Sequence, residues 1–160
     1  MIDTALSAAL EESVADILEK MFFIPAVSSA PAVSSGGLPE IAAQLSFLGE
    51  PSGILTLRVS QDLARSIGAD FLGVDMDEVS QQQVEQVICE LANMICGSVL
   101  SRARGATTFH LLAPAIVPLV LPPADPERAA SHTVTVDGGS LTVVLEAEPV
   151  LCPAKEKFAY

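Results

Sequence analysis

The sequence predicts an α/β (α+β) fold, a sandwich in which long helices pack on a mainly antiparallel sheet. Apolar residues recur every three or four positions in two long segments, as on amphipathic helices. Shorter segments alternate apolar and polar residues, as on half-buried strands. The predicted order is helix, hairpin, long helix and then strands, which suggests two loosely similar helix-plus-hairpin halves. With 160 residues, the chain suits a single domain covering 1–160.

The first helix is indicated by one apolar stripe, formed by Leu6, Leu10, Val14, Ile17 and Met21. Asp3 or Thr4 can cap its start, and Pro25 ends it. The next segment, 25–39, contains Pro-Ala-Val-Ser-Ser twice and has neither a helical nor a strand period. It is typical of a flexible surface loop rich in proline, serine and alanine, and a docking role is the less favoured interpretation.

Two strands, Ile41–Gly49 and Gly53–Val59, are predicted to form a hairpin around the turn at 50–53. Apolar residues alternate along the second strand, and one face of it is formed by Leu55, Leu57 and Val59. A short helix is then predicted over Gln61–Ile67, with Gly68 as its stop.

A long helix is predicted from Asp77 to Arg104. Acidic and hydroxyl residues lie at its positive end and arginines at its negative end, as the helix dipole favours: Asp77, Glu78, Ser80, Arg102 and Arg104. The acidic run 75–78 most simply starts this helix, although it is also suited to meet a basic partner surface.

The C-terminal part is predicted to contain three strands, Thr107–Leu112, Thr133–Val136 and Leu141–Glu146. Asp137-Gly138 is a strong type I′ hairpin signal between the last two. The segment Ala113–Ser131 holds five prolines and is predicted to be a loop or an edge segment.

Composition argues against several classes of function. A net charge of -12 and a pI near 4.3 argue against nucleic-acid binding, which needs a basic stripe. No segment offers the ~20 uninterrupted apolar residues of a membrane span, and the N-terminus lacks the basic region of a signal peptide. Three cysteines make no disulfide framework, and Cys89 and Cys96 would lie roughly 10 Å apart on one helix. A cytoplasmic protein is expected.

The long helix has two contrasting faces when its residues are placed at about 100° intervals. The core face is predicted to consist of Val84, Ile88, Leu91, Ile95 and Val99. The opposite arc carries Gln86, Glu90, Asn93 and Gly97, flanked by Cys89, Cys96 and Leu100 on one side and Met94 on the other. An ordinary solvated face would carry Lys and Glu here, so this arc is predicted to be a contact surface.

Two residues of this arc weaken the helix that holds them. Asn93 is a poor mid-helix residue because its side chain competes for backbone hydrogen bonds. Gly97 costs about 1 kcal/mol relative to Ala in a helix interior. A glycine there would let another chain approach closely beside Asn93. Glu-x-x-Asn alone is a weak pattern, and its place opposite the core with Gly97 beside it makes it more specific.

The segment Val87–Gly97, with the sequence Val-Ile-Cys-Glu-Leu-Ala-Asn-Met-Ile-Cys-Gly, resembles the signature helix of the CheX and CheC chemotaxis phosphatases, Glu-x-x-Asn-x-x-x-Gly. The resemblance extends to Gly53–Arg58, to Asp62–Ala64 and to Leu112–Pro114, which look like that family's strand, short helix start and strand-ending proline. It covers 41–114 well and the two ends only by pattern.

This resemblance implies a CheC/CheX-like α/β sandwich that hydrolyses the aspartyl phosphate of a response regulator such as CheY. It implies that Asn93 orients the attacking water and that Glu90 contacts the regulator's active-site Lys. Gln86 and Gly97 would belong to the same partner-binding face. No cofactor or metal of its own is implied, because the phosphorylated regulator supplies the Mg²⁺. CheX-type relatives form homodimers, so a homodimer is expected.

A second Glu-x-x-Asn, which CheC-type proteins carry on their first helix, is missing here: Glu11, Glu12 and Glu19 are followed at that spacing by Val14, Ala15 and Phe22. The resemblance is therefore to the single-site CheX type. Residue 98 is Ser, where CheX proteins often have Asn.

Two other interpretations stay open: a non-catalytic module of the same fold that binds or assembles response regulators, and an oligomerising structural domain. Cysteine and histidine sites are disfavoured, since none of four residues has partners at ligand spacing: Cys89, Cys96, His110 and His132.

Overall fold

A seven-stranded antiparallel sheet forms the centre of the computed structural model, which describes residues 4–22, 29–30, 40–50, 52–103, 108–118, 129–136 and 139–147. The strand order is β1-β6-β7-β3-β2-β4, and β5 also pairs with β2. The strands are β1 (Ser29–Ala30), β2 (Glu40–Leu48), β3 (Gly53–Ser60), β4 (His110–Leu111), β5 (Ala115–Val117), β6 (Ala129–Val136) and β7 (Gly139–Ala147). Every pairing is antiparallel, which confirms the predicted type of sheet.

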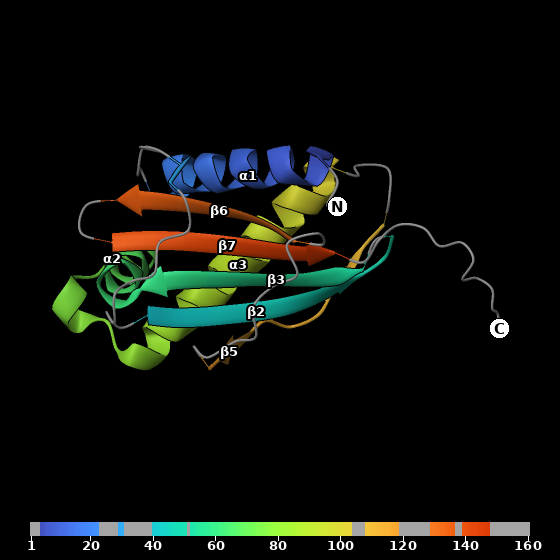
Figure 1. Cartoon of the computed structure of the whole chain (residues 1–160). Helices are drawn as coiled ribbons and strands as arrows, with labels where there is room; N and C mark the ends of the chain where they lie inside the picture. Colours follow the sequence, from blue (N-terminus) through green and yellow to red (C-terminus); the bar gives the residue numbers. More distant parts are fainter. Residues whose placement is uncertain are drawn as a thin grey trace.

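The helices of the described residues all contribute to one core on one face of this sheet: α1 (Thr4–Phe22), α2 (Gln61–Leu72) and α3 (Gln81–Ala103). Figure 1 shows α3 crossing behind the strands on a diagonal. Helix α1 lies beside β6, and α2 lies near the N-terminal end of α3. The architecture is the predicted α/β sandwich of two layers.

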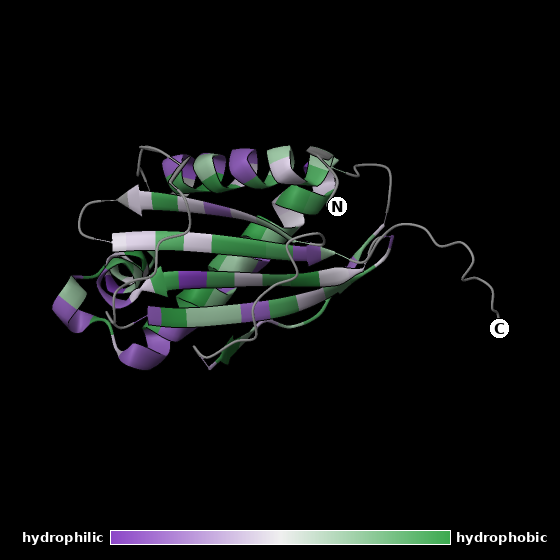
Figure 2. Ribbon diagram, viewed as in Figure 1, coloured by the Kyte–Doolittle hydropathy of each residue, from purple (hydrophilic) through white to green (hydrophobic). Residues whose placement is uncertain are grey.

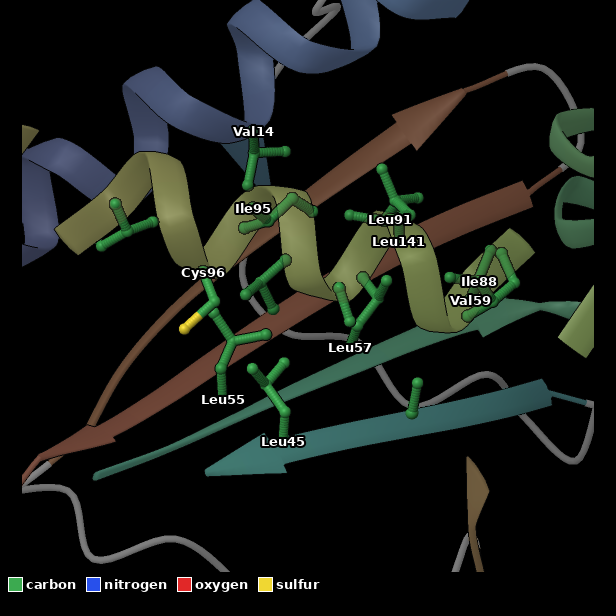
Figure 3. Packing of buried hydrophobic residues seen from close by; sticks show 14 of the residues in the cluster. Val14, Leu45, Leu55, Leu57, Val59, Ile88, Leu91, Ile95, Cys96 and Leu141 are labelled. Atoms are coloured by element: carbon green, nitrogen blue, oxygen red, sulfur yellow. The ribbon is translucent and has the colours of Figure 1, made fainter. Parts of the chain in front are cut away.

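The core is built from aliphatic side chains of α3 and of alternate strand residues. All five residues predicted for the core face of α3 are fully buried: Val84, Ile88, Leu91, Ile95 and Val99. Figure 3 shows Leu91, Ile95 and Cys96 reaching from α3 toward the strands, where Leu55, Leu57 and Leu141 meet them. Burial of this face fixes which side of α3 points outward.

The predicted central hairpin is confirmed, since β2 and β3 pair from Glu40 opposite Ser60 to Phe47 opposite Gly53. The predicted stop of the short helix at Gly68 is wrong. Gly68 lies inside α2, buried against Val79 and Val84, and the helix continues to Leu72. It ends at Gly73, whose φ of 72° places it in the left-handed conformation that glycine tolerates.

The predicted start of the long helix at Asp77 is also wrong. Met76–Glu78 form a separate 3₁₀ turn, and α3 begins at Gln81. Ser80 caps it: the Gln83 backbone N–H donates to the Ser80 hydroxyl at 3.1 Å, and the Ser80 N–H donates to the Gln83 side chain at 2.9 Å. This reciprocal arrangement is a capping box, and it fixes the helix start.

The remaining predictions hold in part. β6 and β7 form the predicted hairpin, with Val136 opposite Gly139, and β6 begins earlier than expected, at Ala129. The proline-rich segment contributes the edge strand β5. The expectation of no strand in 25–39 is wrong for Ser29–Ala30, which pair with β6. The rest of that segment, the turn at 137–138 and the positions Asp3, Pro25, Arg104 and Thr107 lie outside the described residues.

By length and composition, α3 is the one helix within the described residues that could cross a membrane. Half of the apolar stretch of α3 is buried inside the protein, and the apolar face of the helix forms the centre of the core. Figure 2 shows hydrophilic residues on the outward side of α1 and around the connection from α2 to α3.

Candidate functional site

The outward face of α3 carries the four residues that the helical period placed there. Gln86 and Glu90 are exposed, whereas Asn93 and Gly97 are half-buried. They lie opposite the buried face because positions three and four apart stack on one side of a helix, with Cβ atoms roughly 5–6 Å apart. The structure therefore brings Glu90 and Asn93 together on one accessible surface.

The side chains of Glu90 and Asn93 are not engaged elsewhere. Within the described part of the chain, neither makes a hydrogen bond or an ion pair. The Asn93 amide can donate from its nitrogen and accept at its oxygen, so it can hold a water molecule by either atom. The Glu90 carboxylate can accept a charge-assisted hydrogen bond from a cation on a partner. Both groups are available to a ligand or partner.

Gly97 has no internal reason to be a glycine. A Cβ added at this position would meet nothing within 4 Å among the described residues. Packing within the chain therefore does not require the glycine, although it costs about 1 kcal/mol of helix stability relative to Ala. The glycine leaves the helix backbone open one turn beyond Asn93, and a partner's atoms can approach this backbone closely.

Fewer of the predicted flanking residues are accessible than the sequence suggested. Cys96 and Leu100 are buried in the core, and only Cys89 and Met94 are partly exposed beside the arc. Burial raises the pKa of the Cys96 thiol to about 12. Burial and the nearby Glu85 carboxylate raise the pKa of the Cys89 thiol. Neither cysteine has the lowered pKa that a nucleophile or metal ligand needs.

The C-terminal half of α3 is held against α1 by a polar cluster that the sequence did not reveal. Ser98 donates through its hydroxyl to the buried Ser13 hydroxyl of α1 at 2.9 Å. Arg102 donates to Ser98 at 3.2 Å and to the Asp16 carboxylate at 2.8 Å. The same guanidinium lies 3.9 Å from the Glu12 carboxylate. This cluster fixes α1 beside the turn that follows Gly97.

Other candidate sites receive no support from the geometry. Among the described residues, no three or more His, Cys, Asp or Glu side chains are grouped so as to hold a metal ion. His110 is exposed at the start of β4, and His132 is half-buried on β6. Cys89 and Cys96 are both free thiols. The face carrying Glu90 and Asn93 is therefore the best-formed candidate site.

A second surface was missed by the sequence analysis. Four large apolar residues at the end of α2 and in the turn after it are exposed: Phe71, Leu72, Val74 and Met76. The sequence did contain a signal, because these apolar residues alternate with the acidic residues 70, 75, 77 and 78 rather than following a helical period. From the sequence alone, the acidic run is interpreted mainly as the start of a helix.

Comparisons with known proteins agree with the predicted resemblance. The family model described as chemotaxis phosphatase CheX matches residues 41–135, more than half of the chain. No protein of curated function matches this chain.

Several solved structures share the fold. A CheC-like superfamily protein from Shewanella sp. PV-4 has a TM-score of 0.73 at 14% identity, covering 92% of this chain and 100% of that one. CheX in the CheX-CheY-BeF3-Mg complex from Borrelia burgdorferi has a TM-score of 0.71 at 13% identity, covering 93% and 100%. CheX from Desulfovibrio desulfuricans has a TM-score of 0.66 at 18% identity, covering 89% and 99%.

Proposed function

Because this chain belongs to the CheX chemotaxis phosphatase family, we propose that it dephosphorylates the aspartyl phosphate of a CheY-like response regulator. The proposal places Asn93 over the phosphoryl group, where its amide orients a water molecule for in-line attack. Glu90 contacts the regulator's active-site Lys and so fixes the position of Asn93. Gln86 and Gly97 complete the surface that meets the regulator.

The observation that carries the proposal is the free amide of Asn93 beside the open backbone at Gly97. The amide makes no hydrogen bond within the described residues, and no described atom lies where a Cβ at Gly97 would reach. The helix therefore presents a water-orienting group beside a position without a side chain, so that another protein's active site can approach it closely. Both residues are unfavourable for the helix itself, which argues for a role outside folding.

The chemistry requires little more than this arrangement. An acyl phosphate already has a good leaving group, so positioning the water supplies most of what the protein must add. A glutamine performs the comparable task in small GTPases, where it orients the attacking water. The Mg²⁺ that neutralises the phosphoryl oxygens would come with the regulator. With the metal ion supplied by the regulator, the proposed mechanism requires no metal ligands in the CheX-type chain.

The partner is suggested by a structural relative. The Borrelia burgdorferi protein is seen in a complex with CheY, BeF3 and magnesium. A matching partner for the present chain is a regulator of the CheY type in its phosphorylated state. We also expect the chain to form a homodimer, which sedimentation velocity of the purified protein would measure directly.

The test is dephosphorylation of the host's purified response regulators, each phosphorylated in the presence of Mg²⁺. Wild type is compared with Asn93→Ala and with the control Gln82→Ala. Gln82 is an exposed amide on the same helix, roughly 16 Å along the axis from Asn93. We expect wild type and Gln82→Ala to accelerate phosphate loss from one regulator, and Asn93→Ala to do so about 100-fold more slowly.

Binding distinguishes the alternatives. If Asn93→Ala still binds the regulator but does not dephosphorylate it, the catalytic role stands. Equal activity of Asn93→Ala and wild type would exclude water positioning by this residue. If the wild type binds a regulator without accelerating its dephosphorylation, the chain is a regulator-binding module of the same fold.

A further inference from the structure

An exposed apolar surface with an acidic edge lies where α2 ends and turns back toward α3. We call it the α2 tip, and it consists of Phe71, Leu72, Val74 and Met76 together with the carboxylates of Asp70, Asp75, Asp77 and Glu78. The four apolar residues are between 39% and 44% exposed. Four large apolar side chains gathered on one short stretch are more typical of a contact surface than of single surface residues.

The backbone of the α2 tip is held rigid from several sides. The N–H groups of Gly73 and Val74 both donate to the Ala69 carbonyl, at 2.8 and 3.0 Å. Arg65 donates through Nη2 to the carbonyls of Met76 and Val79, at 2.9 and 3.0 Å. A surface that is already ordered loses little conformational entropy when a partner binds, so its apolar groups contribute more of their burial energy to affinity.

A second capping box orders the turn itself. Asp75 and Glu78 exchange side-chain and backbone hydrogen bonds at the two ends of the 3₁₀ turn. This assigns a structural role to two of the four carboxylates. Asp70 and Asp77 have no such role among the described residues, and both are exposed.

The charged side chains of the α2 tip are all acidic, and the position of Asp70 is unfavourable for the stability of α2. Asp70 lies in the last turn of α2, where the helix dipole favours a basic residue, and that turn contains none. No Lys or Arg occurs in 70–80, and the nearby Arg65 guanidinium is occupied by backbone carbonyls. A surface of this kind is complementary to an apolar patch edged with Lys and Arg.

The α2 tip lies within reach of a protein bound at Glu90 and Asn93. Its turn leads directly into α3 at Gln81, roughly 13 Å along the helix axis from Glu90. A stable interface covers about 800 Å² per partner, a patch of roughly 16 Å radius. Glu90 and Asn93 together cover only a small part of such an area, so a regulator held there needs further contacts.

From these observations we infer that the α2 tip is a second contact surface for the response regulator and recognises an apolar surface edged with basic residues. The inference rests on the proposed function for the identity of the partner. The α2 tip supplies affinity and speeds the encounter, whereas Glu90 and Asn93 act on the phosphoryl group.

The test measures binding and hydrolysis separately. Binding is titrated with regulators held in the phosphorylated-like state by BeF3 and Mg²⁺, and hydrolysis is followed with the phosphorylated regulators. The first variant is the double substitution Leu72→Ser and Met76→Ser. Its matched control is Leu112→Ser, which removes an apolar residue of similar exposure, 40%, after β4. We expect Kd and KM to rise about tenfold in the double variant, with kcat within twofold of wild type and the control unchanged.

A charge variant tests the acidic edge without weakening the fold. Asp70→Lys replaces an acid by a base at the C-terminal end of α2, which should raise the melting temperature. We expect it to lower the association rate constant about fivefold at low salt and to reduce the dependence of that rate on ionic strength. Reduced binding by a variant of raised melting temperature excludes unfolding as the cause.

The outcomes separate this inference from the proposed function. Unchanged Kd in both variants overturns the α2 tip as a contact surface, even if Asn93-dependent hydrolysis is observed. If a regulator binds in a manner that depends on the α2 tip but is never dephosphorylated, the contact surface stands and the phosphatase assignment fails. If no regulator binds the wild type, both are overturned.

Discussion

Ser98 of α3 donates a hydrogen bond to Ser13 of α1 across 2.9 Å, so two residues that are 85 positions apart in the sequence join the two helices. Ser13 is fully buried, so its hydroxyl depends on partners within the protein. Ser98 follows Gly97 directly, and it also accepts a hydrogen bond from Arg102. The serine pair therefore fixes α1 next to the end of the candidate site.

Ser98→Ala should destabilise the protein by about 1–3 kcal/mol, because it leaves the buried Ser13 hydroxyl with one partner fewer. For a chain of this size that corresponds to a fall in melting temperature of roughly 2–4 °C per kcal/mol. Urea denaturation of the two proteins measures the difference. The double variant Ser13→Ala with Ser98→Ala should lose less than the sum of the two single changes, because no unpaired hydroxyl remains. Strictly additive losses would contradict a direct interaction.

Much of the fold could be predicted because periodicity alone decides which side of an element is buried. The core face of α3 follows from apolar residues three and four apart, and all of them are buried as expected. The alternation in β3 likewise places Leu55, Leu57 and Val59 on the buried face of the sheet. The candidate site follows from the same argument, since the face opposite the core must point outward.

Boundaries were predicted less well because several residues offered the same local signal. Gly68 and Gly73 both permit a helix end, and only Gly73 takes up the left-handed conformation. Asp75 and Ser80 are both good caps, and each is used: Asp75 caps the 3₁₀ turn and Ser80 caps α3. Local preference identifies the competing positions, and tertiary packing, such as burial of Gly68 against Val84, selects among them.

Contacts between distant segments could not be predicted from one sequence. Nothing in the spacing of Ser13, Asp16 and Arg102 reveals that they meet, since their partners lie on another helix. The helical wheel also did not decide whether Cys96 packs in the core or in an interface. On the helical wheel it borders the exposed arc, yet it is fully buried in the core, and Figure 3 shows it directed toward Leu55.

Cys96 should make the stability depend on pH in the alkaline range. Burial raises its pKa from the ordinary value of 9.0 to about 12. Above pH 9 the unfolded chain loses this proton while the folded chain keeps it, so the unfolded state binds fewer protons. The contribution to stability is therefore complete below pH 9 and declines between pH 9 and about 12, by at most about 1.4 kcal/mol per pH unit. Urea denaturation at pH 7.5, 9 and 10 measures this slope.

The control for this pH dependence is Cys96→Ala, which removes the thiol. Its stability should decline less steeply above pH 9 than that of wild type. Identical slopes in the two proteins would mean that the Cys96 thiol does not remain protonated in the folded state. As a separate readout, iodoacetamide should leave Cys96 unmodified at pH 8 until the protein unfolds, because alkylation requires the thiolate.

Glu90→Gln should weaken regulator binding while leaving much of the chemistry intact. The substitution keeps the shape of the side chain and removes the charge that is proposed to meet the regulator's Lys. We expect KM to rise about tenfold, and the salt dependence of KM to become weaker than in wild type. Glu85→Gln, at a half-buried glutamate on the same helix, is the control for charge alone. A fall in kcat with KM unchanged would place Glu90 in the chemical step instead.

Gly97→Ala should separate stability from function most sharply, because the two are expected to change in opposite directions. The added methyl group would meet no described atom within 4 Å, and alanine favours a helix interior by about 1 kcal/mol over glycine. The variant should therefore unfold at a higher urea concentration than wild type. If the regulator closes over the bare backbone beside Asn93, the same methyl group should raise KM by roughly tenfold through steric conflict.

Gly68→Ala is the matched control for this substitution. Gly68 lies inside α2, and a Cβ there would make ordinary contacts of 3.6 Å with Val79 and Val84. It should gain similar helix stability and leave the kinetics unchanged, since it is buried away from the outward face of α3. A stabilised Gly97→Ala protein with wild-type KM would show that no partner approaches the helix at this position. Greater stability together with weaker regulator binding, in Gly97→Ala and not in Gly68→Ala, would show that the glycine is kept for contact with the partner.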